Sequence, residues 1–229
     1  MPTAPTKQTA ATVAEPTRPA RRRPGRPQGG RAIADRSQLL AAAELVISTN
    51  GPDATMEAIA SGAGVTKPIL YRGVGDRDAL VAALAEVLVD RINTASSVAY
   101  RRARTPRARM RSLVAAYIEV VESNRNLYLF VTAGGSNVDR VGQAMHLADR
   151  SAVPISAELA KQRAATKQSP AVALTWSYGL IGTLQFVTLW WLRDATITAD
   201  QLVDHVTELL WSGVGGTSSP RPASRKAVT

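Results

Sequence analysis

The segment from residue 55 to residue 80, TMEAIASGAGVTKPILYRGVGDRDAL, constrains the fold more than any other part of this chain. Its first apolar residues recur at positions i, i+3, i+4 and i+7, which places them on one face of a helix. They are Met56, Ile59, Ala60 and Ala63. Gly62 and Gly64 then permit a sharp reversal, since glycine adopts positive φ without steric cost. Thr66 can cap a second short helix that carries Pro68 in its first turn. This order predicts a helix-turn-helix, whose second helix enters the major groove of DNA.

The rest of the body also has helical periodicity, and no long alternation of apolar and polar residues predicts a strand. We therefore expect an all-α fold, in which a three-helix DNA-binding domain precedes a helical ligand-binding and dimerisation domain. Further helices are expected at 35–49, 76–98, 107–123, 138–166, 171–192 and 198–212, with a short apolar segment at 127–131. Pro154 should kink or divide the helix that contains it. The expected divisions are a disordered basic arm (1–31), the DNA-binding domain (32–90), the second domain (91–213) and a disordered tail (214–229).

The net charge of +10 is concentrated at the two ends of the chain. Residues 1–31 hold seven lysines or arginines and one acidic residue, and residues 213–229 hold three basic residues and no acid. The body between them is nearly neutral, so the basic character suits arms that follow a polyanion, although solvated tails have the same composition. Without cysteine the chain has no disulfide, and this is consistent with a cytoplasmic protein.

The residues of the helix-turn-helix resemble the DNA-binding domain of the TetR family of bacterial regulators over about residues 35 to 90. The matching residues are Thr55-Met56, Ile59-Ala60, Ala63-Gly64-Val65-Thr66-Lys67-Pro68, Leu70-Tyr71, Asp76-Arg77 and Leu80. The chain departs from the family at Gly73-Val74, where the family usually has aromatic or His/Phe-type residues. A glycine there weakens the end of the helix by roughly 1 kcal/mol relative to alanine.

The resemblance implies roles for the residues of this segment in binding double-stranded DNA. Tyr71 and Arg77 would contact phosphates, and Thr55 would offer its hydroxyl and a helix N-terminus to another phosphate. Four side chains would face base edges, where cationic groups donate to guanine and methyl groups meet thymine. They are Thr66, Lys67, Pro68 and Arg72. With Leu70 turned inward, Ile69 would face outward toward thymine methyls.

A second DNA signal lies in the basic arm. The run Arg21-Arg22-Arg23-Pro24-Gly25-Arg26-Pro27 resembles the core of an AT-hook, which fits the narrow minor groove of A·T tracts. We therefore expect Arg23 and Arg26 to contact the minor groove beside the half-site.

The second domain is rich in apolar and aromatic residues with few compensating charges, which favours an enclosed lipophilic pocket or simple core packing. The candidate ligand-binding residues are Tyr117, Leu127, Phe130, Trp176, Phe186 and Trp190. The run Gly179-Leu180-Ile181-Gly182, with the double tryptophan that follows, resembles actinobacterial regulators that sense fatty acyl-CoA. Six arginines between residues 101 and 111 form either a solvated connector or an anion site for a phosphate-bearing ligand such as an acyl-CoA.

Small residues on the helix at 171–192 and apolar residues on the last helix suggest a two-fold interface of four helices. The expected interface residues are Gly179, Gly182, Thr183, Val206, Leu209 and Leu210. A dimer would read a near-palindrome with half-sites about 34 Å apart, or a multiple of that distance.

Two other classes of protein have little support in the sequence. Residues 171–192 carry no formal charge and are long enough to span a bilayer, but polar residues interrupt them, so we expect no stable membrane insertion. The chain has two histidines, His146 and His205, and shows no serine motif, metal-ligand spacing or phosphate loop. We therefore expect no enzyme, cofactor or metal site.

Together these features predict a homodimeric, ligand-responsive repressor whose effector is a lipophilic small molecule, with fatty acyl-CoA as one candidate. A co-repressor is equally compatible with the sequence. The alternative is a DNA-binding architectural or membrane-tethered protein that senses no ligand. Neither the effector, the operator, the regulated genes nor the number of dimers per operator can be derived from the residues.

Overall fold

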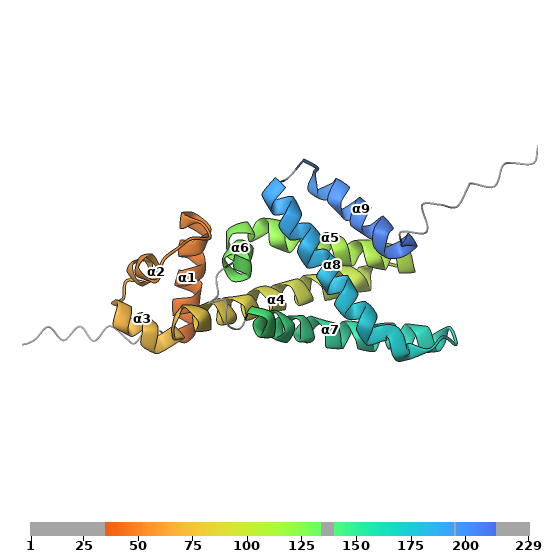
Figure 1. The fold of residues 1–229 in the computed structure, drawn as a ribbon, viewed down its shortest axis with the longest axis horizontal. Coiled ribbons are helices and arrows are strands. Elements are labelled where there is room, and N and C mark those ends of the chain that lie inside the picture. Colours follow the sequence, from red (N-terminus) through yellow and green to blue (C-terminus); the bar gives the residue numbers. More distant parts are fainter. Residues whose placement is uncertain (1–34, 134–139, 195, 214–229) are drawn as a thin grey trace, which may run out of the picture. The chain divides into compact units, whose positions relative to one another are not determined.

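The computed structural model describes residues 35–133, 140–194 and 196–213, and within these ranges all regular structure is helical (Figure 1). The elements are α1 (Arg36–Asn50), α2 (Met56–Gly62), α3 (Lys67–Val74), α4 (Arg77–Arg102), α5 (Pro106–Ser123), α6 (Arg125–Ala133), α7 (Arg140–Ala165), the 3-10 turn η1 (Pro170–Val172), α8 (Ala173–Asp194) and α9 (Ala199–Ser212). The all-α prediction is confirmed, and the helix-turn-helix lies where the sequence placed it. The basic arm and the tail lie outside the described residues.

Local capping explains where the first helices begin. The Gln38 side chain accepts a hydrogen bond from the backbone N–H of Asp35 at 3.2 Å, at the start of α1. The Thr55 hydroxyl accepts from the Ala58 N–H at 3.2 Å at the start of α2, and the Asp76 carboxylate accepts from the Ala79 N–H at 2.8 Å at the start of α4. These caps satisfy backbone donors that have no partner within the helix.

Glycines follow the ends of two of these helices, and a third glycine permits two helices to pack closely. Gly51 and Gly75, with φ of 92° and 85°, follow α1 and α3 in a conformation that other residues rarely adopt. Gly62 differs from the expectation, because it is the last residue of α2 and is absent from the positive-φ glycines of the described chain, which do include Gly64. A Cβ added at Gly62 would lie 2.3 Å from Val46 Cγ2, so this glycine lets α2 approach α1.

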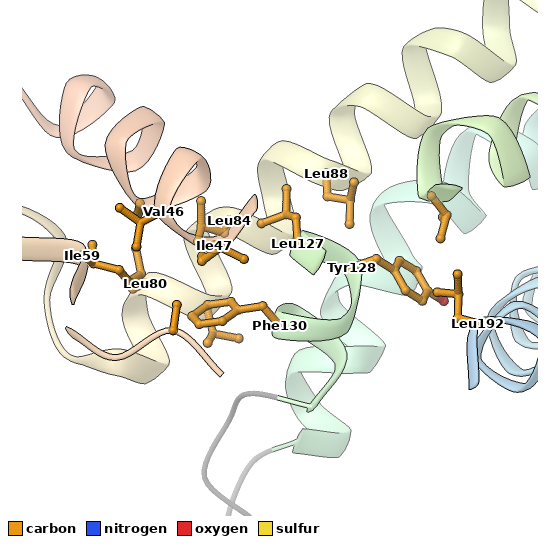
Figure 2. Packing of buried hydrophobic residues seen from close by; sticks show 14 of the residues in the cluster. Val46, Ile47, Ile59, Leu80, Leu84, Leu88, Leu127, Tyr128, Phe130 and Leu192 are labelled. Atoms are coloured by element: carbon orange, nitrogen blue, oxygen red, sulfur yellow. The ribbon is translucent and has the colours of Figure 1, made fainter. Parts of the chain in front are cut away.

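The helix α4 belongs to both halves of the fold, since the expected boundary at residue 90 falls inside it. Its fully buried residues all lie between Leu80 and Leu88, where α4 packs on the first helices and on α6. In Figure 2, Leu127 and Phe130 of α6 point toward α1 and α4, whereas Tyr128 points toward Leu192 of α8. One apolar core therefore joins the helix-turn-helix to the helices that follow it.

The remaining helices pack on α4 and on one another. Helix α5 lies along α4 and also contacts α9, while α7 contacts α4 and α8. Helix α7 continues through Pro154 as one helix, so the proline does not divide it. The contact between α4 and α7 includes polar pairs, since Arg150 bonds Asp90 at 2.7 Å and Ser151 bonds Asn93 at 3.0 Å.

Candidate functional site

Helix α3 presents a continuous exposed surface on the side away from the core. Leu70 and Val74 are buried against the other helices, which fixes the rotation of α3 about its axis. The exposed residues are Thr66, Lys67, Pro68, Ile69, Tyr71 and Arg72. The structure therefore brings together on one surface six of the residues that the sequence predicts for DNA binding. This set is called the α3 face below.

Lys67 on the α3 face forms an ion pair that the sequence did not reveal. Its Nζ lies 2.8 Å from Oε2 of Glu57 on α2, and both side chains are exposed. The hydrogen bond and the opposite charge raise the pKa of Lys67 and lower the pKa of Glu57. Glu57 thus holds the end of the lysine beside the α3 face and places a negative charge next to it.

The two threonines differ in what their hydroxyls do. Thr55 is exposed and caps α2, so it combines a helix N-terminus with a hydroxyl that already accepts from Ala58. Thr66 precedes α3 but makes no side-chain capping bond within the described chain, which leaves its hydroxyl available to a base or a phosphate.

Arg77, which the resemblance assigns to a phosphate contact, forms contacts within the protein. Its Nη1 donates to the backbone oxygen of Ala54 at 2.9 Å, and its guanidinium lies 4.7 Å from the centre of the Phe130 ring. The side chain is half-buried, so it links α4 to the loop before α2 and to α6. A cation over an aromatic face in a partly desolvated place is favourable, which explains why the arginine turns toward the protein.

Gly73, the point where the sequence departs from the expected aromatic residues, permits α3 to pack on α1. A Cβ added there would lie 2.3 Å from Cδ1 of Leu39, which is buried. The glycine therefore serves a close approach between two helices, and α3 extends one residue beyond it, to Val74. Arg23 and Arg26, the other two predicted DNA contacts, lie outside the described residues.

The six aromatic and apolar residues expected around a ligand separate into two groups. Leu127 and Phe130 are buried in the core that joins α6 to α1 and α4 (Figure 2). Tyr117 is partly buried against that core. Trp176, Phe186 and Trp190 are exposed on α8. The six residues therefore do not lie together in the single chain, and the inward face of α8 is formed by other residues. The buried residues of α8 include Ser177, Leu184, Thr188, Trp191 and Leu192.

A pair of tyrosines forms a polar centre inside the helical half of the protein. The hydroxyls of Tyr117 and Tyr128 lie 3.0 Å apart, and the Tyr128 hydroxyl lies 3.4 Å from the backbone oxygen of Gln185 on α8. Burial raises the pKa of Tyr117 well above its ordinary value and raises the pKa of Tyr128 to about 12. Both phenols are therefore neutral and can donate hydrogen bonds to a polar group among apolar side chains.

The residues expected at a dimer interface are also divided by the structure. Gly179 and Leu209 are exposed, and Gly182, Thr183 and Leu210 are partly exposed, on α8 and α9. Val206 is buried within the chain's own core, so its assignment to the interface is corrected. It lies on the face of α9 that packs against α5.

Two family models match the chain. Residues 39–84 match the model described as bacterial regulatory proteins of the tetR family, and residues 98–225 match the tetracyclin repressor-like C-terminal domain. The second match alone covers more than half of the chain. The chain belongs to the TetR family. It is thus a helix-turn-helix transcriptional regulator, and the α3 face lies on its DNA-binding domain.

Curated relatives and solved structures agree with the TetR assignment. The chain is 24% identical over 185 residues to an uncharacterised helix-turn-helix transcriptional regulator of Mycobacterium tuberculosis, covering 79% of this chain and 77% of the relative. It is 26% identical over 178 residues to the transcriptional activator FasR of Mycolicibacterium smegmatis, covering 77% and 80% of the two chains.

The similar solved structures include two proteins named FadR. The fatty acid degradation regulator FadR of Bacillus halodurans matches with a TM-score of 0.64 at 18% identity, covering 78% of this chain and 95% of that chain. FadR of Bacillus subtilis in complex with stearoyl-CoA matches with a TM-score of 0.63 at 17% identity, covering 78% and 98%. At these identities the similarity shows a shared fold.

In this TetR chain the arginines between residues 101 and 111 are not equivalent. Arg107 pairs with Glu208 at 2.7 Å and Arg111 with Asp204 at 2.9 Å, which joins α5 to α9. The guanidinium of Arg109 lies 5.1 Å from the Tyr100 ring centre. Arg101, Arg102 and Arg104 are exposed and have no partner among the described residues. Much of the cluster is therefore engaged in contacts between helices.

Helix α8 lies in the segment that the sequence analysis considered as a possible membrane span. The segment Pro170–Arg193 is long and apolar enough to cross a membrane by length and composition, and 22% of its most apolar window is buried. The same test is met by helices of soluble proteins, and TetR-family regulators are soluble DNA-binding proteins. In the described part of the chain, no group of three or more His, Asp or Glu side chains could hold a metal ion.

Sequence reasoning missed three features of the site. Glu57 is detectable as the acidic residue of the first turn of α2, but its distance from Lys67 depends on how α2 meets α3. Tyr128 is adjacent to Leu127 and was overlooked as a partner for Tyr117. Trp211 is exposed near the end of α9, and the sequence gave no indication of this exposure.

Proposed function

We propose that this TetR-family protein is a transcriptional repressor that binds a near-palindromic operator as a homodimer and responds to a lipophilic small molecule, with a fatty acyl-CoA as the candidate effector. The observation that carries the DNA-binding part is the α3 face, where cationic, aromatic and hydroxyl side chains are exposed together while Leu70 and Val74 anchor the helix. One such face covers only a few base pairs, so two copies are required for a selective site.

The roles within the α3 face follow from side-chain chemistry. Lys67 and Arg72 can donate to guanine, Ile69 and Thr66 can contact thymine methyls, and Pro68 can add apolar contact with a base edge. Tyr71 and Thr55 are suited to phosphates, through a phenolic hydroxyl and through the N-terminus of α2. Arg77 is assigned instead to holding α4 against α6.

The proposal of a lipophilic effector is supported by the decrease in side-chain burial along α4. No residue of α4 after Leu88 is fully buried, and Ala152 is the one fully buried residue among the described side chains of α7. Ile92 of α4 and Leu180 of α8 are apolar yet only partly buried. An apolar ligand that lies between these helices would complete their burial, and the neutral tyrosine pair could bond its polar group. The similarity in fold to a FadR that binds stearoyl-CoA supports this class of ligand.

Helix α6 offers a route by which such a ligand could change DNA binding. The guanidinium of Arg125 donates to the backbone oxygen of Leu192 at the end of α8, and the Asn126 amide donates to the Ser48 oxygen of α1 at 2.9 Å. A ligand that favours one position of α8 would therefore bias α1 and α4 through α6. Its effect is limited by its unequal affinity for the two states, typically ~1–3 kcal/mol.

The test is a binding titration of the purified full-length protein on the DNA upstream of its own gene, with unrelated DNA as the control. Measurements at two salt concentrations, with and without stearoyl-CoA, separate the parts of the proposal. We expect selective, salt-dependent binding that the acyl-CoA weakens. Equal weak binding to both DNAs would contradict the proposal of a specific operator. If the acyl-CoA strengthens DNA binding instead, it acts as a co-repressor.

The basic arm provides a separate prediction. Removal of residues 1–30 should weaken operator binding and make its dependence on salt less steep, because each lost phosphate contact reduces the slope of log K against log salt by about 0.9. The measurement is the salt slope of the truncated protein compared with that of the full chain. An unchanged slope would mean that Arg23 and Arg26 do not contact DNA.

A further inference from the structure

A polar cleft with a volume of about 680 Å³ lies between the start of α5 and the middle of α9. The described residues that line it come from α5, α9 and the turn before α5. They are Thr105, Arg107, Ala108, Arg111, Asp204, His205, Thr207 and Glu208. None of them belongs to α4, α7 or α8, the helices between which the lipophilic effector is proposed to lie. The hollow, called the α5–α9 cleft below, is therefore separate from that apolar site.

Thr207 brings a buried hydroxyl to the wall of the α5–α9 cleft. The residue is 3% exposed, and its Oγ1 has no hydrogen-bond partner among the residues that the structure describes. The buried hydroxyl of Ser177 on α8 differs, because it donates to the backbone oxygen of Ala173 at 2.8 Å. Buried hydroxyls normally have a partner, so the Thr207 hydroxyl is available to a polar group that enters the cleft.

Two ion pairs cross the cleft, and a ligand can replace them at little cost. Arg107 on α5 lies 2.7 Å from Glu208 on α9, and one helical turn away Arg111 lies 2.9 Å from Asp204. All four side chains are about half exposed, where ion pairs contribute little to stability. The Ser212 hydroxyl also donates to Glu208 at 2.7 Å, so this carboxylate keeps a partner when Arg107 turns to a ligand.

The two walls of the cleft favour different groups of one ligand. Arg107 lies in the first turn of α5, an 18-residue helix whose N-terminus attracts anions. Arg101, Arg102 and Arg104 precede this turn, are exposed and have no partner in the described part of the chain. The wall formed by α9 instead carries two carboxylates, which accept hydrogen bonds. A ligand that suits both walls has a strongly anionic end and an end rich in hydrogen-bond donors.

We propose that the α5–α9 cleft binds a nucleotide. Its phosphates lie at Arg107 and the N-terminus of α5, since guanidinium groups bind phosphate through paired hydrogen bonds. Its ribose hydroxyls or base amino group donate to Asp204 and Glu208, as carboxylates accept from ribose hydroxyls in other nucleotide sites. The Thr207 hydroxyl bonds a polar atom of the same ligand. The proposal goes beyond the lipophilic effector, because it gives the regulator a second site for a different class of molecule.

Isothermal titration calorimetry of the full-length protein tests this site with adenosine triphosphate, adenosine and inorganic phosphate as probes. Adenosine triphosphate should bind about tenfold more tightly than either of the others, because it alone contacts both walls. Arg107→Gln and Thr207→Val should each weaken its binding by about fivefold or more. Arg150→Gln is the matched control, since Arg150 forms an exposed ion pair with Asp90 outside the cleft and its loss should leave binding unchanged.

The melting temperature distinguishes a ligand-binding hydroxyl from a structural one. Thr207→Val removes an unpaired hydroxyl and nearly preserves the shape of the side chain, so the ligand-free variant should melt at the same temperature or higher. Unchanged affinity for adenosine triphosphate in Thr207→Val and Arg107→Gln would overturn the proposal and place the nucleotide elsewhere, such as on the α3 face. Equal affinity for adenosine triphosphate and adenosine would also overturn it, because the arginines would then have no role.

The nucleotide could be free or could be the end of a coenzyme A thioester, and two further probes separate these sources. A free nucleotide predicts that coenzyme A binds no more tightly than 3′-phosphoadenosine 5′-diphosphate. Coenzyme A that binds about tenfold more tightly, and loses affinity in Thr207→Val, would support the cleft and assign it to the thioester. If no nucleotide binds, the cleft proposal fails while the operator titration with stearoyl-CoA still decides the lipophilic effector.

Discussion

Replacing Phe130 by alanine should lower the free energy of unfolding by about 3–5 kcal/mol, the range found for truncation of a buried aromatic side chain. Phe130 is fully buried where α6 meets α1 and α4 (Figure 2). Its ring lies under the guanidinium of Arg77. The substitution leaves a cavity and also removes the aromatic face from a half-buried cation. Urea denaturation followed by circular dichroism gives the difference in free energy.

Phe130→Leu is the matched control, since it retains most of the apolar volume and should cost less than about half as much as the alanine variant. A loss below about 1 kcal/mol in Phe130→Ala would show that the residue borders a space already open, as expected of a ligand site. That outcome would restore the original assignment of Phe130 to the effector pocket. The Leu variant also tests Arg77, because only the aromatic ring can hold the cation.

The helix-turn-helix could be predicted from local sequence because its determinants are local. Apolar spacing, the capping residue Thr55 and Pro68 define α2 and α3 within twenty residues. The inward direction of Leu70 then follows from helical geometry, and with it the exposure of Ile69. No distant contact has to be known for these steps, so the structure agrees with the positions of both helices and with the inward direction of Leu70.

The features that the sequence did not predict concern residues whose surroundings depend on contacts far along the chain. Arg77 is part of the matched motif, but its guanidinium is directed by Phe130, more than fifty residues away. The rotation of α8 is determined by α7, α5 and α9, and this rotation decides that Trp191 is buried while Trp190 is exposed. Hydropathy alone treats the two tryptophans alike. Gly73 similarly looked like a weak helix end, although a Cβ there would lie only 2.3 Å from Cδ1 of Leu39 on α1.

The second large effect is expected from substitutions at the α3 face and concerns the affinity for DNA. Lys67→Ala should weaken operator binding by about 1–3 kcal/mol if the lysine donates to a base, and it should relax selectivity at one position of each half-site. Glu57→Gln should act in the opposite direction. It releases the Lys67 ammonium from a 2.8 Å ion pair and removes a negative charge that would face the phosphates.

The double variant Glu57→Gln/Lys67→Ala separates the two contributions of Glu57. If Glu57 acts only by restraining Lys67, the double variant binds as weakly as Lys67→Ala alone, because the released lysine is absent. If it also repels the backbone, the double variant binds more tightly than Lys67→Ala, and the difference decreases as salt is raised. Fluorescence anisotropy with the operator and with a duplex altered at each half-site position measures both affinity and selectivity. A Lys67→Ala variant with unchanged affinity and unchanged selectivity would mean that the lysine makes no contact with a base and only forms the ion pair that links α3 to Glu57 of α2.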